Sequence, residues 1–380
     1  MNILHTIPGR NWGGMEQRTL EQVRWLNSHG HRCWFAAPED GEPFRRAVAL
    51  GVEAVPMNFD VPWRPGTIRA LRRFVREHAI EVIDTHVTRD AKAAIGCRGL
   101  CAVVRSRHTD HTMRSSLLRR LQWRYGADHI ITVAGTTRRH LIDIGLADPE
   151  RATWIGGWAD ERFFRLADPA AARARIRSEL ELTPDTFVLL CAAMLRPDKG
   201  QDHLLNAVEL LLKRGLPVVC LLAGAATDET PAYATQLRER AAALGSAVRF
   251  LGYRDDIPDL MQAADVFVLS SLIEGQPRVV VQAFASARPV VAARVGGVSD
   301  IVIPGETGWI VPPADPEALA AAIAEVARDP AAAAAMAANA HHLAKTTMRL
   351  DLRMAETLRV YRAAIDRSRR RGARIPQPAG

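Results

Sequence analysis

The sequence has no apolar run long enough to cross a bilayer, because its longest strongly apolar stretch, residues 216–226, is about half of what a transmembrane helix needs. Residues 1–7 lack a basic segment followed by an apolar core, so we expect no signal peptide. The five cysteines are odd in number and scattered, which favours reduced thiols over a disulfide framework. These absences predict a cytoplasmic globular protein.

Lysine is scarce as well, since only Lys92, Lys199, Lys213 and Lys345 contribute to the 50 basic residues that oppose 42 acidic ones. A bias toward arginine and alanine is typical of a GC-rich bacterial genome. The formal net charge is +8, but the basic stretches lack the aromatic interleaving of nucleic-acid modules. We therefore expect no nucleic-acid partner.

Several familiar motifs are missing. The chain contains neither a GxGxxG dinucleotide fingerprint nor a GxxxxGK[ST] phosphate loop. Cys97 and Cys101 are four residues apart, but no second Cys or His pair with zinc-site spacing accompanies them. The sequence therefore predicts no metal site.

Short β-branched runs alternate with amphipathic stretches along the whole chain, and 380 residues suit two domains. We expect strands at residues 3–7, 32–36, 54–57, 81–84, 103–106, 130–133, 187–192, 218–222, 248–251, 266–269 and 289–292. Such alternation indicates parallel sheets covered by helices on both faces. The predicted fold class is α/β, with two tandem doubly wound, Rossmann-like domains.

Three segments lie at predicted strand-to-helix turns, where parallel sheets bind ligands. Gly9, Gly13 and Gly14 follow the first strand and allow either a close approach to a ligand or a tight turn. Arg196 and Lys199 precede a predicted helix, where cations oppose the helix dipole unless an anion binds; solvated side chains are the alternative. Residues 270–283 form the third segment, in which helix-terminal amides could hold a diphosphate.

The second half resembles the donor domain of GT-B-fold retaining glycosyltransferases of family 4, also called glycosyl transferases group 1. The resemblance is carried, in order, by residues 194–200 (MLRPDKG), 222–224 (LAG), 248–253 (VRFLGY), 264–270 (ADVFVLS), 274–277 (EGQP), 287–291 (ARPVV) and 307–309 (TGW). In the first half, residues 13–16 (GGME) and 104–108 (VRSRH) resemble the acceptor domain of that family. The likeness covers nearly the whole chain.

This resemblance implies a role for each matching residue. Lys199 would neutralise the donor diphosphate, with Arg196 as a second cation, and Glu274 would contact the transferred sugar. The other donor-binding residues that it implies are Tyr253 and Arg254 at the base, Gly275, Gln276, Pro277, Arg278 and Val279 at sugar hydroxyls and phosphate oxygens, Gln282 at the ribose, and Gly13 and Gly14 over the phosphates. His108 would reach the sugar or acceptor side.

The domains that the resemblance implies are an acceptor-side domain at residues 1–165 and a nucleotide-sugar donor domain at residues 166–345. A C-terminal helix at 346–368 would pack back on the first domain, and residues 369–380 would form a frayed basic tail. The sequence departs from the family pattern in having Gln282 in place of a second glutamate and Met194 in place of an arginine.

The implied reaction is metal-independent transfer of a sugar from a nucleotide diphosphate-sugar, without a further cofactor, to a cell-envelope glycan or lipid-linked acceptor. No Asp-x-Asp signature of metal-dependent sugar transferases stands out. A nucleotide-sugar epimerase of the same fold is one alternative. A non-catalytic nucleotide-sugar-binding relative is the other, and Gln282 and Met194 motivate it.

Residues 113–125 are basic, amphipathic and aromatic-bearing. They fit either a peripheral contact with the anionic inner face of the cytoplasmic membrane or an ordinary helix that buries Leu117, Leu118 and Leu121. Asp110 and His111 lie beside His108 and fit either acceptor-binding groups or a salt bridge within a loop.

Overall fold

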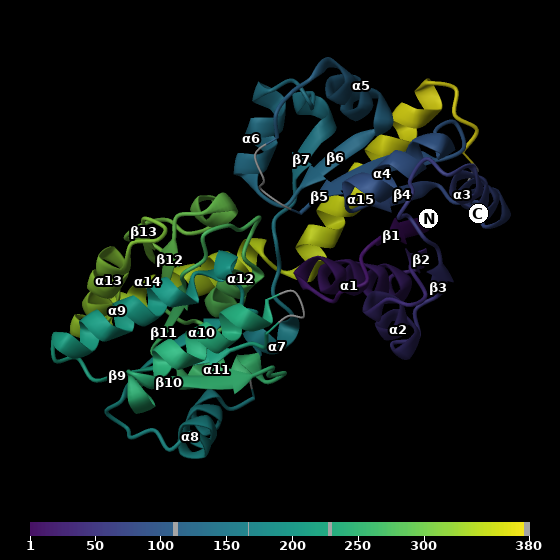
Figure 1. Ribbon diagram of the computed structural model, residues 1–380. Coiled ribbons are helices and arrows are strands. Elements are labelled where there is room, and N and C mark those ends of the chain that lie inside the picture. The colour runs from purple at the N-terminus through teal and green to yellow at the C-terminus, as the bar shows by residue number, and fades with distance from the viewer. Residues whose placement is uncertain (109–112, 166, 227–229, 376–380) are drawn as a thin grey trace. The chain divides into compact units, whose positions relative to one another are not determined.

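The computed structural model describes residues 1–108, 113–165, 167–226 and 230–375. The chain divides into two compact units (Figure 1): unit 1 comprises Met1–Gly156 with Asp351–Gly380, and unit 2 comprises Gly157–Leu350. The division at Gly157 precedes the expected boundary at residue 165. Residues just after Gly157 belong to unit 2 because the Ala159 N–H donates to the Met348 carbonyl at 3.2 Å.

A parallel sheet forms the centre of unit 1. Its strands in chain order are β1 (Asn2–Thr6), β2 (Arg32–Ala37), β3 (Ala54–Pro56), β4 (Val82–Thr85), β5 (Ala102–Arg107), β6 (His129–Thr132) and β7 (Ala152–Trp154). Their order in the sheet is β3-β2-β1-β4-β5-β6-β7. The order reverses between β1 and β4, and the crevice at such a reversal is where doubly wound folds bind ligands.

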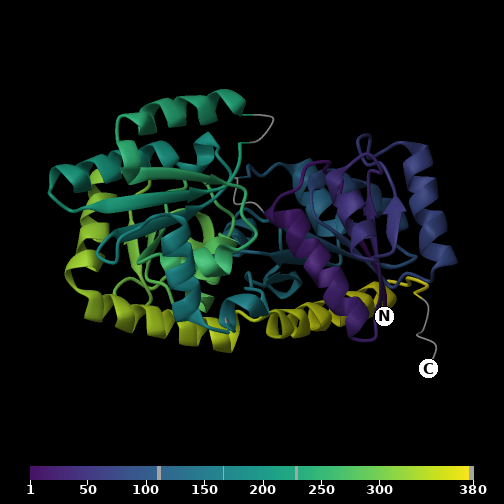
Figure 2. The same ribbon diagram turned by 90° about the horizontal axis from the view of Figure 1, so that it is seen from below.

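Helices surround this sheet, as Figures 1 and 2 show. They are α1 (Gly14–Ser28), α2 (Glu42–Ala49), α3 (Pro65–Glu77), α4 (Thr88–Ala94), α5 (Leu117–Gly126), α6 (Gly135–Asp143) and α15 (Leu350–Arg370), with short 3-10 turns η1 (Ile95–Cys97) and η2 (Pro149–Arg151). The C-terminal helix α15 lies beside α1 (Figure 2), where the Trp25 indole N–H donates to Asp351 at 2.7 Å.

Unit 2 has a second parallel sheet with the order β10-β9-β8-β11-β12-β13. Its strands are β8 (Phe187–Ala192), β9 (Val218–Ala223), β10 (Val248–Gly252), β11 (Val266–Leu269), β12 (Val290–Ala293) and β13 (Trp309–Val311). Alternate residues of β8 enter two separate apolar clusters, Val188 and Leu190 one of them and Leu189 and Cys191 the other. Both faces of the sheet are therefore buried, as a doubly wound domain requires.

The helices of unit 2 are α7 (Glu161–Phe164), α8 (Pro169–Glu179), α9 (Gln201–Lys213), α10 (Pro231–Ala242), α11 (Ile257–Ala263), α12 (Arg278–Ala285), α13 (Pro316–Arg328) and α14 (Pro330–Thr347), with the turns η3 (Pro197–Lys199), η4 (Gly245–Ala247) and η5 (Gly296–Asp300). Two parallel-sheet, Rossmann-like α/β units confirm the predicted fold class. None of the helices in the described ranges is long and apolar enough to span a membrane.

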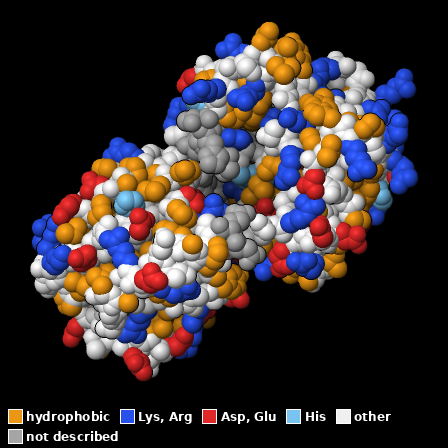
Figure 3. All heavy atoms as spheres, viewed as in Figure 1, with side chains coloured by type: hydrophobic (Ala, Val, Ile, Leu, Met, Phe, Trp, Pro, Cys, Tyr) orange, Lys and Arg blue, Asp and Glu red, His pale blue; other side chains and the backbone are white. Residues whose placement is uncertain are grey.

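The interpretation of residues 113–125 as a helix that buries three leucines is wrong. The helix α5 exists, but Leu117, Leu118 and Leu121 are 76%, 78% and 46% exposed. Its buried aromatic residue is Trp123, over which the Arg105 guanidinium lies at 3.6 Å from the ring centroid. Figure 3 shows hydrophobic and basic side chains together on the surface in the region where Figure 1 labels α5.

Candidate functional site

The first candidate region lies in unit 2, at the carboxyl ends of the neighbouring parallel strands β8 and β11. The chain that leaves β8 forms η3 and then α9, which places Lys199 at the start of α9. The chain that leaves β11 carries Glu274. The Lys199 Nζ and Glu274 Oε1 atoms are 2.8 Å apart, and the two side chains are 16% and 14% exposed. The structure thus joins two predicted site residues in one half-buried ion pair.

Further hydrogen bonds fasten the two loops to each other. The Ser271 hydroxyl donates to Glu274 Oε1 at 2.8 Å. The Ser270 hydroxyl donates to the Lys199 carbonyl at 2.9 Å, and the Leu272 N–H donates to the Asp198 carbonyl at 2.8 Å. The positions of the cation and the carboxylate are therefore set by backbone as well as by their mutual attraction.

Two glycines allow the backbones to approach this closely. Gly200 has φ +62°, and a Cβ placed there would lie 2.2 Å from the Ser270 carbonyl oxygen. Gly296 has φ +45°, and a Cβ there would lie 1.8 Å from the Glu274 carbonyl oxygen. Since L side chains avoid positive φ and neither contact leaves room for a methyl group, both positions require glycine.

The second predicted cation, Arg196, lies beside Lys199 but has its own partner. Its Nε atom donates to Asp198 Oδ1 at 2.9 Å, while Lys199 Nζ lies 3.7 Å from Asp198 Oδ2. Two cations thus face Asp198 and Glu274 at the N-terminal end of a helix. An incoming diphosphate could exchange with these carboxylates as the partner of the cations.

The remaining residues predicted in unit 2 occupy different settings. Tyr253 is 64% exposed, and the Arg254 guanidinium is held by Asp256 at 2.6 Å and by Glu179 at 2.7 Å. Those two carboxylates raise the pKa of Arg254. The side chain of Arg254 is therefore committed to structure, which leaves the backbone at 253–254 as the group that could face a base.

Residues 275–279 form the turn into α12. Gly275 accepts from the Gly297 N–H at 2.7 Å, and the Gln276 side-chain oxygen accepts from the Gly157 N–H. The turn ends at Pro277, after which α12 begins with Arg278, Val279 and, further along, the half-buried Gln282. The Arg278 guanidinium lies 5.9 Å from the centroid of the Trp158 ring.

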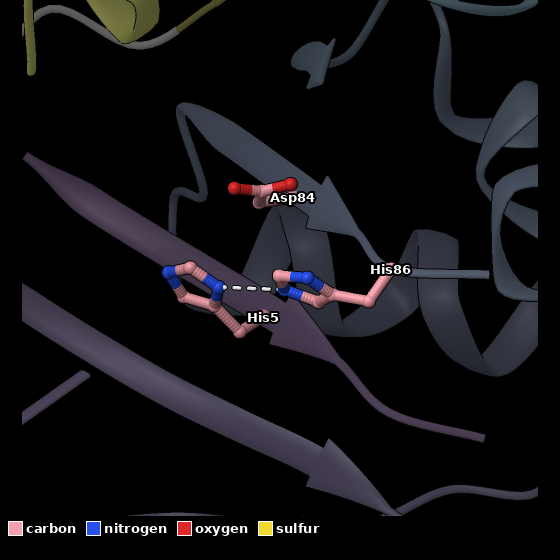
Figure 4. A group of neighbouring side chains, drawn as sticks. All are labelled: His5, Asp84 and His86. Atoms are coloured by element: carbon pink, nitrogen blue, oxygen red, sulfur yellow. Dashed lines mark hydrogen bonds between the residues drawn. The ribbon is translucent and has the colours of Figure 1, made fainter. Parts of the chain in front are cut away.

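The second candidate region lies in unit 1, where three histidines follow one another through hydrogen bonds. His5 comes from β1, His86 directly follows β4, and His108 directly follows β5. The His5 Nδ1 and His86 Nε2 atoms are 3.0 Å apart, and the His86 Nδ1 and His108 Nε2 atoms are 2.8 Å apart. Figure 4 shows His5, Asp84 and His86 turned toward one another.

Asp84 closes the inner end of this chain. Its carboxylate accepts from the Tyr361 hydroxyl of α15 at 2.6 Å and from the Ser106 hydroxyl at 2.8 Å. The Tyr361 oxygen also lies 3.4 Å from His5 Nε2. Burial in apolar surroundings raises the pKa of Asp84 to about 7 and lowers the pKa of His5 to about 3. Sequence reasoning predicted only His108 of this group.

Within the part of the chain that is described, His5, Asp84 and His86 are the group whose ligand atoms lie near enough to one another, within 4.8 Å, to hold a metal ion. The facing nitrogens of His5 and His86, however, already share a hydrogen bond. Each carboxylate oxygen of Asp84 accepts a hydrogen bond from a hydroxyl group. The donor set is thus arranged as a satisfied polar network.

The glycine-rich turn after β1 is shaped by Glu16. Gly13 is the N-cap of α1 with φ −151°, and its N–H donates to the Glu16 carboxylate. A Cβ at Gly9 or at Gly13 would lie 3.2 Å from a Glu16 carboxylate oxygen, whereas one at Gly14 would meet open space. The Glu16 carboxylate thus lies against Gly9 and Gly13 and fastens the turn, while the space at Gly14 is open. Asp110 and His111 lie outside the described residues.

Comparisons with known proteins agree with this architecture. Residues 186–329 match the family model described as glycosyl transferases group 1, and residues 12–161 match the one described as glycosyltransferase family 4. A D-inositol 3-phosphate glycosyltransferase of Kineococcus radiotolerans is 34% identical over 65% of this chain and 60% of its own. The lipopolysaccharide core biosynthesis mannosyltransferase LpcC of Rhizobium leguminosarum is 27% identical over 81% and 82%.

The chain spans about half the length of two curated D-inositol 3-phosphate glycosyltransferases that it matches. Among solved structures, a glycosyltransferase from Rickettsia africae aligns with a TM-score of 0.86 at 18% identity, covering 96% of this chain and 98% of that one. HepE of Anabaena, solved with UDP and glucose, aligns with a TM-score of 0.80 at 23% identity, covering 94% and 99%. Likeness at these identities concerns the fold.

Proposed function

The chain belongs to the family 4 glycosyltransferases of group 1, and from that membership we propose that it transfers a sugar from a nucleotide diphosphate-sugar to a glycan or lipid-linked acceptor of the cell envelope, with retention of configuration. The observation that carries the proposal is the half-buried Lys199–Glu274 pair at the start of α9. It lies at the carboxyl edge of the sheet, where doubly wound domains hold phosphates.

In the proposed reaction, Lys199 stabilises the negative charge of the leaving diphosphate. The bond between the sugar and the diphosphate breaks through an oxocarbenium-like state, and negative charge grows on the diphosphate oxygens. The Lys199 ammonium and the amides at the helix starts stabilise that charge. The acceptor hydroxyl attacks from the same face, and its proton passes to the leaving phosphate. Glu274 holds hydroxyls of the transferred sugar.

Two relatives support the choice of substrates. HepE of Anabaena was solved with UDP and glucose, which supports a nucleotide-sugar donor. The Rhizobium relative acts in lipopolysaccharide core biosynthesis, which supports an envelope acceptor. In the proposed reaction, Lys199 and Arg196 take the role that a metal ion would otherwise have at the diphosphate.

Helix α5 supports a peripheral contact of the same enzyme with an anionic membrane. Leu117, Leu118 and Tyr125 are 60–78% exposed on a helix that also carries Arg119, Arg120 and Arg124. Exposed apolar side chains together with arginines are the composition of an interfacial helix. A lipid-linked acceptor would reach the enzyme at such a surface.

The transfer proposal is tested by turnover. Purified protein is screened by thermal shift against UDP-, GDP-, ADP- and dTDP-sugars, and the stabilising donor is then incubated with envelope extract while free nucleotide is measured. Release of nucleotide that depends on the extract is the expected result. A donor that binds without any release identifies a non-catalytic relative, and conversion of the donor sugar without an acceptor identifies an epimerase. Either outcome contradicts the proposal.

The membrane contact is tested with vesicles that contain anionic lipid. Replacing Leu117 and Leu118 together by serine should weaken vesicle binding by about tenfold, because two exposed apolar side chains can no longer enter the interface. Leu50→Ser is the matched control, since Leu50 is 49% exposed in the same unit. Equal binding by the double variant and the control would contradict a contact through α5.

A further inference from the structure

The hydrogen bonds that link Asp84, Tyr361, His5, His86 and His108, here called the histidine chain, all run in one direction. That direction follows from the number of protons that each group carries. Burial lowers the pKa of His5 to about 3 and holds that of His86 well below its usual range, so each of these rings is neutral and carries one N–H. Burial also raises the pKa of Tyr361 well above its ordinary value, so the phenol keeps its proton. Each member of the chain therefore has one proton to donate.

The first proton is fixed by Asp84. When Asp84 is ionised, its carboxylate can only accept hydrogen bonds. The Tyr361 hydroxyl therefore donates its hydrogen bond to Asp84 Oδ2, at 2.6 Å. The Tyr361 oxygen then has only lone pairs for His5 Nε2, which lies 3.4 Å away. His5 must therefore carry its proton on Nε2 and present a bare Nδ1.

The proton position on His5 in turn fixes the proton positions on His86 and His108. A bare His5 Nδ1 requires the proton of His86 to be on Nε2, because these two atoms are 3.0 Å apart. His86 Nδ1 is then bare and accepts from His108 Nε2 at 2.8 Å. His108, which is half-buried at the end of β5, is left with an unprotonated Nδ1.

We propose that Asp84, Tyr361, His5 and His86 are positioning residues that fix the tautomer of His108, so that its Nδ1 presents a lone pair to a substrate hydroxyl. The identity of that hydroxyl, on the donor sugar or the acceptor, rests on the proposed function. The tautomer itself does not, because it follows from hydrogen bonds within unit 1.

The backbone around the chain holds it in place. The Asp90 carboxylate accepts from the His86 N–H at 2.7 Å, from the Val87 N–H at 3.0 Å and from the Thr6 hydroxyl at 2.8 Å. His5 and Asp84 are fully buried, and the His86 residue is 3% exposed. Water cannot easily supply an alternative partner for these groups, so the direction set at Asp84 reaches His108 intact.

The experiment is long-range nitrogen–proton NMR of histidine-labelled full-length protein without any substrate, in which chemical shifts distinguish protonated from bare imidazole nitrogens. Spectra are recorded at about pH 8.5, where Asp84 is ionised, and His108→Gln assigns the signals. We expect His108 to be protonated on Nε2 and bare on Nδ1. Protonation on Nδ1 would overturn the proposal, as would bare nitrogens on both facing atoms of His5 and His86, which indicate a bound metal.

Tyr361→Phe tests whether Asp84 sets the direction of the hydrogen bonds in the histidine chain. It removes only the hydroxyl that links Asp84 to His5, and we expect the ratio of the two His108 tautomers to fall by about tenfold, the factor that one buried hydrogen bond controls. Tyr233→Phe is the matched control, because its hydroxyl bonds to Gln201 and Asp202 in unit 2. A His108 tautomer ratio unchanged in Tyr361→Phe would contradict the proposal whether or not the protein transfers sugar.

Discussion

The two units place polar side chains at the same topological position but in opposite electrostatic states. In unit 2, Lys199 and Glu274 are charged, half-buried and paired at 2.8 Å. In unit 1, His5, Asp84 and His86 are buried, and the imidazoles are neutral links in a hydrogen-bond chain. A half-buried ion pair can exchange one partner for a ligand, whereas a buried chain of neutral imidazoles that begins at a carboxylate can only orient the group at its outer end. In the two proposals, unit 2 binds the donor diphosphate and unit 1 orients a substrate hydroxyl.

The largest expected effect comes from crowding the charged region. Gly296→Ala would place a methyl group 1.8 Å from the Glu274 carbonyl oxygen at a φ of +45°, so the loop must move, and we expect a loss of more than about 4 kcal/mol of stability together with donor binding. Gly305→Ala is the control, since Gly305 has φ +75° with nothing within 4 Å; it should cost about 1 kcal/mol. Thermal unfolding and calorimetric titration measure both. Equal losses of stability in Gly296→Ala and Gly305→Ala would show that the loop at Gly296 can move to make room for the methyl group at little cost.

Glu274→Gln should reduce sugar transfer by about 100-fold while leaving the fold intact. The amide keeps the size of the side chain and can still accept from Ser271, but it removes the charge that faces Lys199. Glu209→Gln is the matched control, because Glu209 pairs with Lys213 at 2.6 Å on the exposed face of α9. Rates of nucleotide release decide the matter, and full activity of Glu274→Gln would remove this carboxylate from the reaction.

Lys199→Ala should weaken the binding of the nucleoside diphosphate selected by the thermal-shift screen by about 30-fold, the effect of one charge-assisted hydrogen bond. Lys213→Ala, on a side chain that is 68% exposed, should leave affinity unchanged. Isothermal titration of both variants supplies the comparison. If the two lysines prove equivalent, the charge in unit 2 serves stability and not ligand exchange.

The smallest effect is a dependence of unit 1 on pH. Burial lowers the pKa of His5 to about 3 and that of His129 to about 4, so below about pH 6.5 the unfolded chain takes up protons that the folded unit refuses, and stability falls on acidification. Burial raises the pKa of Asp84 to about 7 and of Asp90 to about 6, which opposes this change, because folded unit 1 retains protons between about pH 4 and 7.

Between pH 7 and pH 5 the losses from His5 and His129 nearly cancel the gains from Asp84 and Asp90. Burial also lowers the pKa of His86 and His108, so we expect a net loss of stability in unit 1 on acidification. Hydrogen exchange of peptides from β1 and β8, corrected for the intrinsic rate, separates the units. His129→Gln should reduce the loss, because the amide can still donate to Thr153 without titrating. Greater acid sensitivity in β8 than in β1 would reverse the comparison between the units.

The fold and the charged region could largely be predicted from the sequence, and the reason is local. Strands β8 and β11 coincide with their predicted ranges because each is a continuous apolar run. Lys199 and Glu274 lie in contiguous motifs whose order is visible in the chain. The sequence does not predict the three-residue edge strands β7 and β13, which are too short to show a clear pattern, although β3, of the same length, is predicted.

The histidine chain could not be predicted because its members are far apart in sequence. Tyr361 and His5 are separated by 356 positions, and a single tyrosine on a C-terminal helix has the pattern of a core residue. The exposure of Leu117 and Leu118 could not be predicted either, because amphipathic spacing identifies the apolar face of a helix but not what packs against that face.

The helix α15 brings residues from the end of the chain into the interior of unit 1, where Tyr361 reaches Asp84 and Ser368 reaches the Cys101 carbonyl. During synthesis on the ribosome, unit 2 is therefore continuous and complete from Gly157 to Leu350 before unit 1 has all of its parts. Unit 1 is thus translated first but completed last, because Asp84 lacks its phenol donor until α15 has been synthesised.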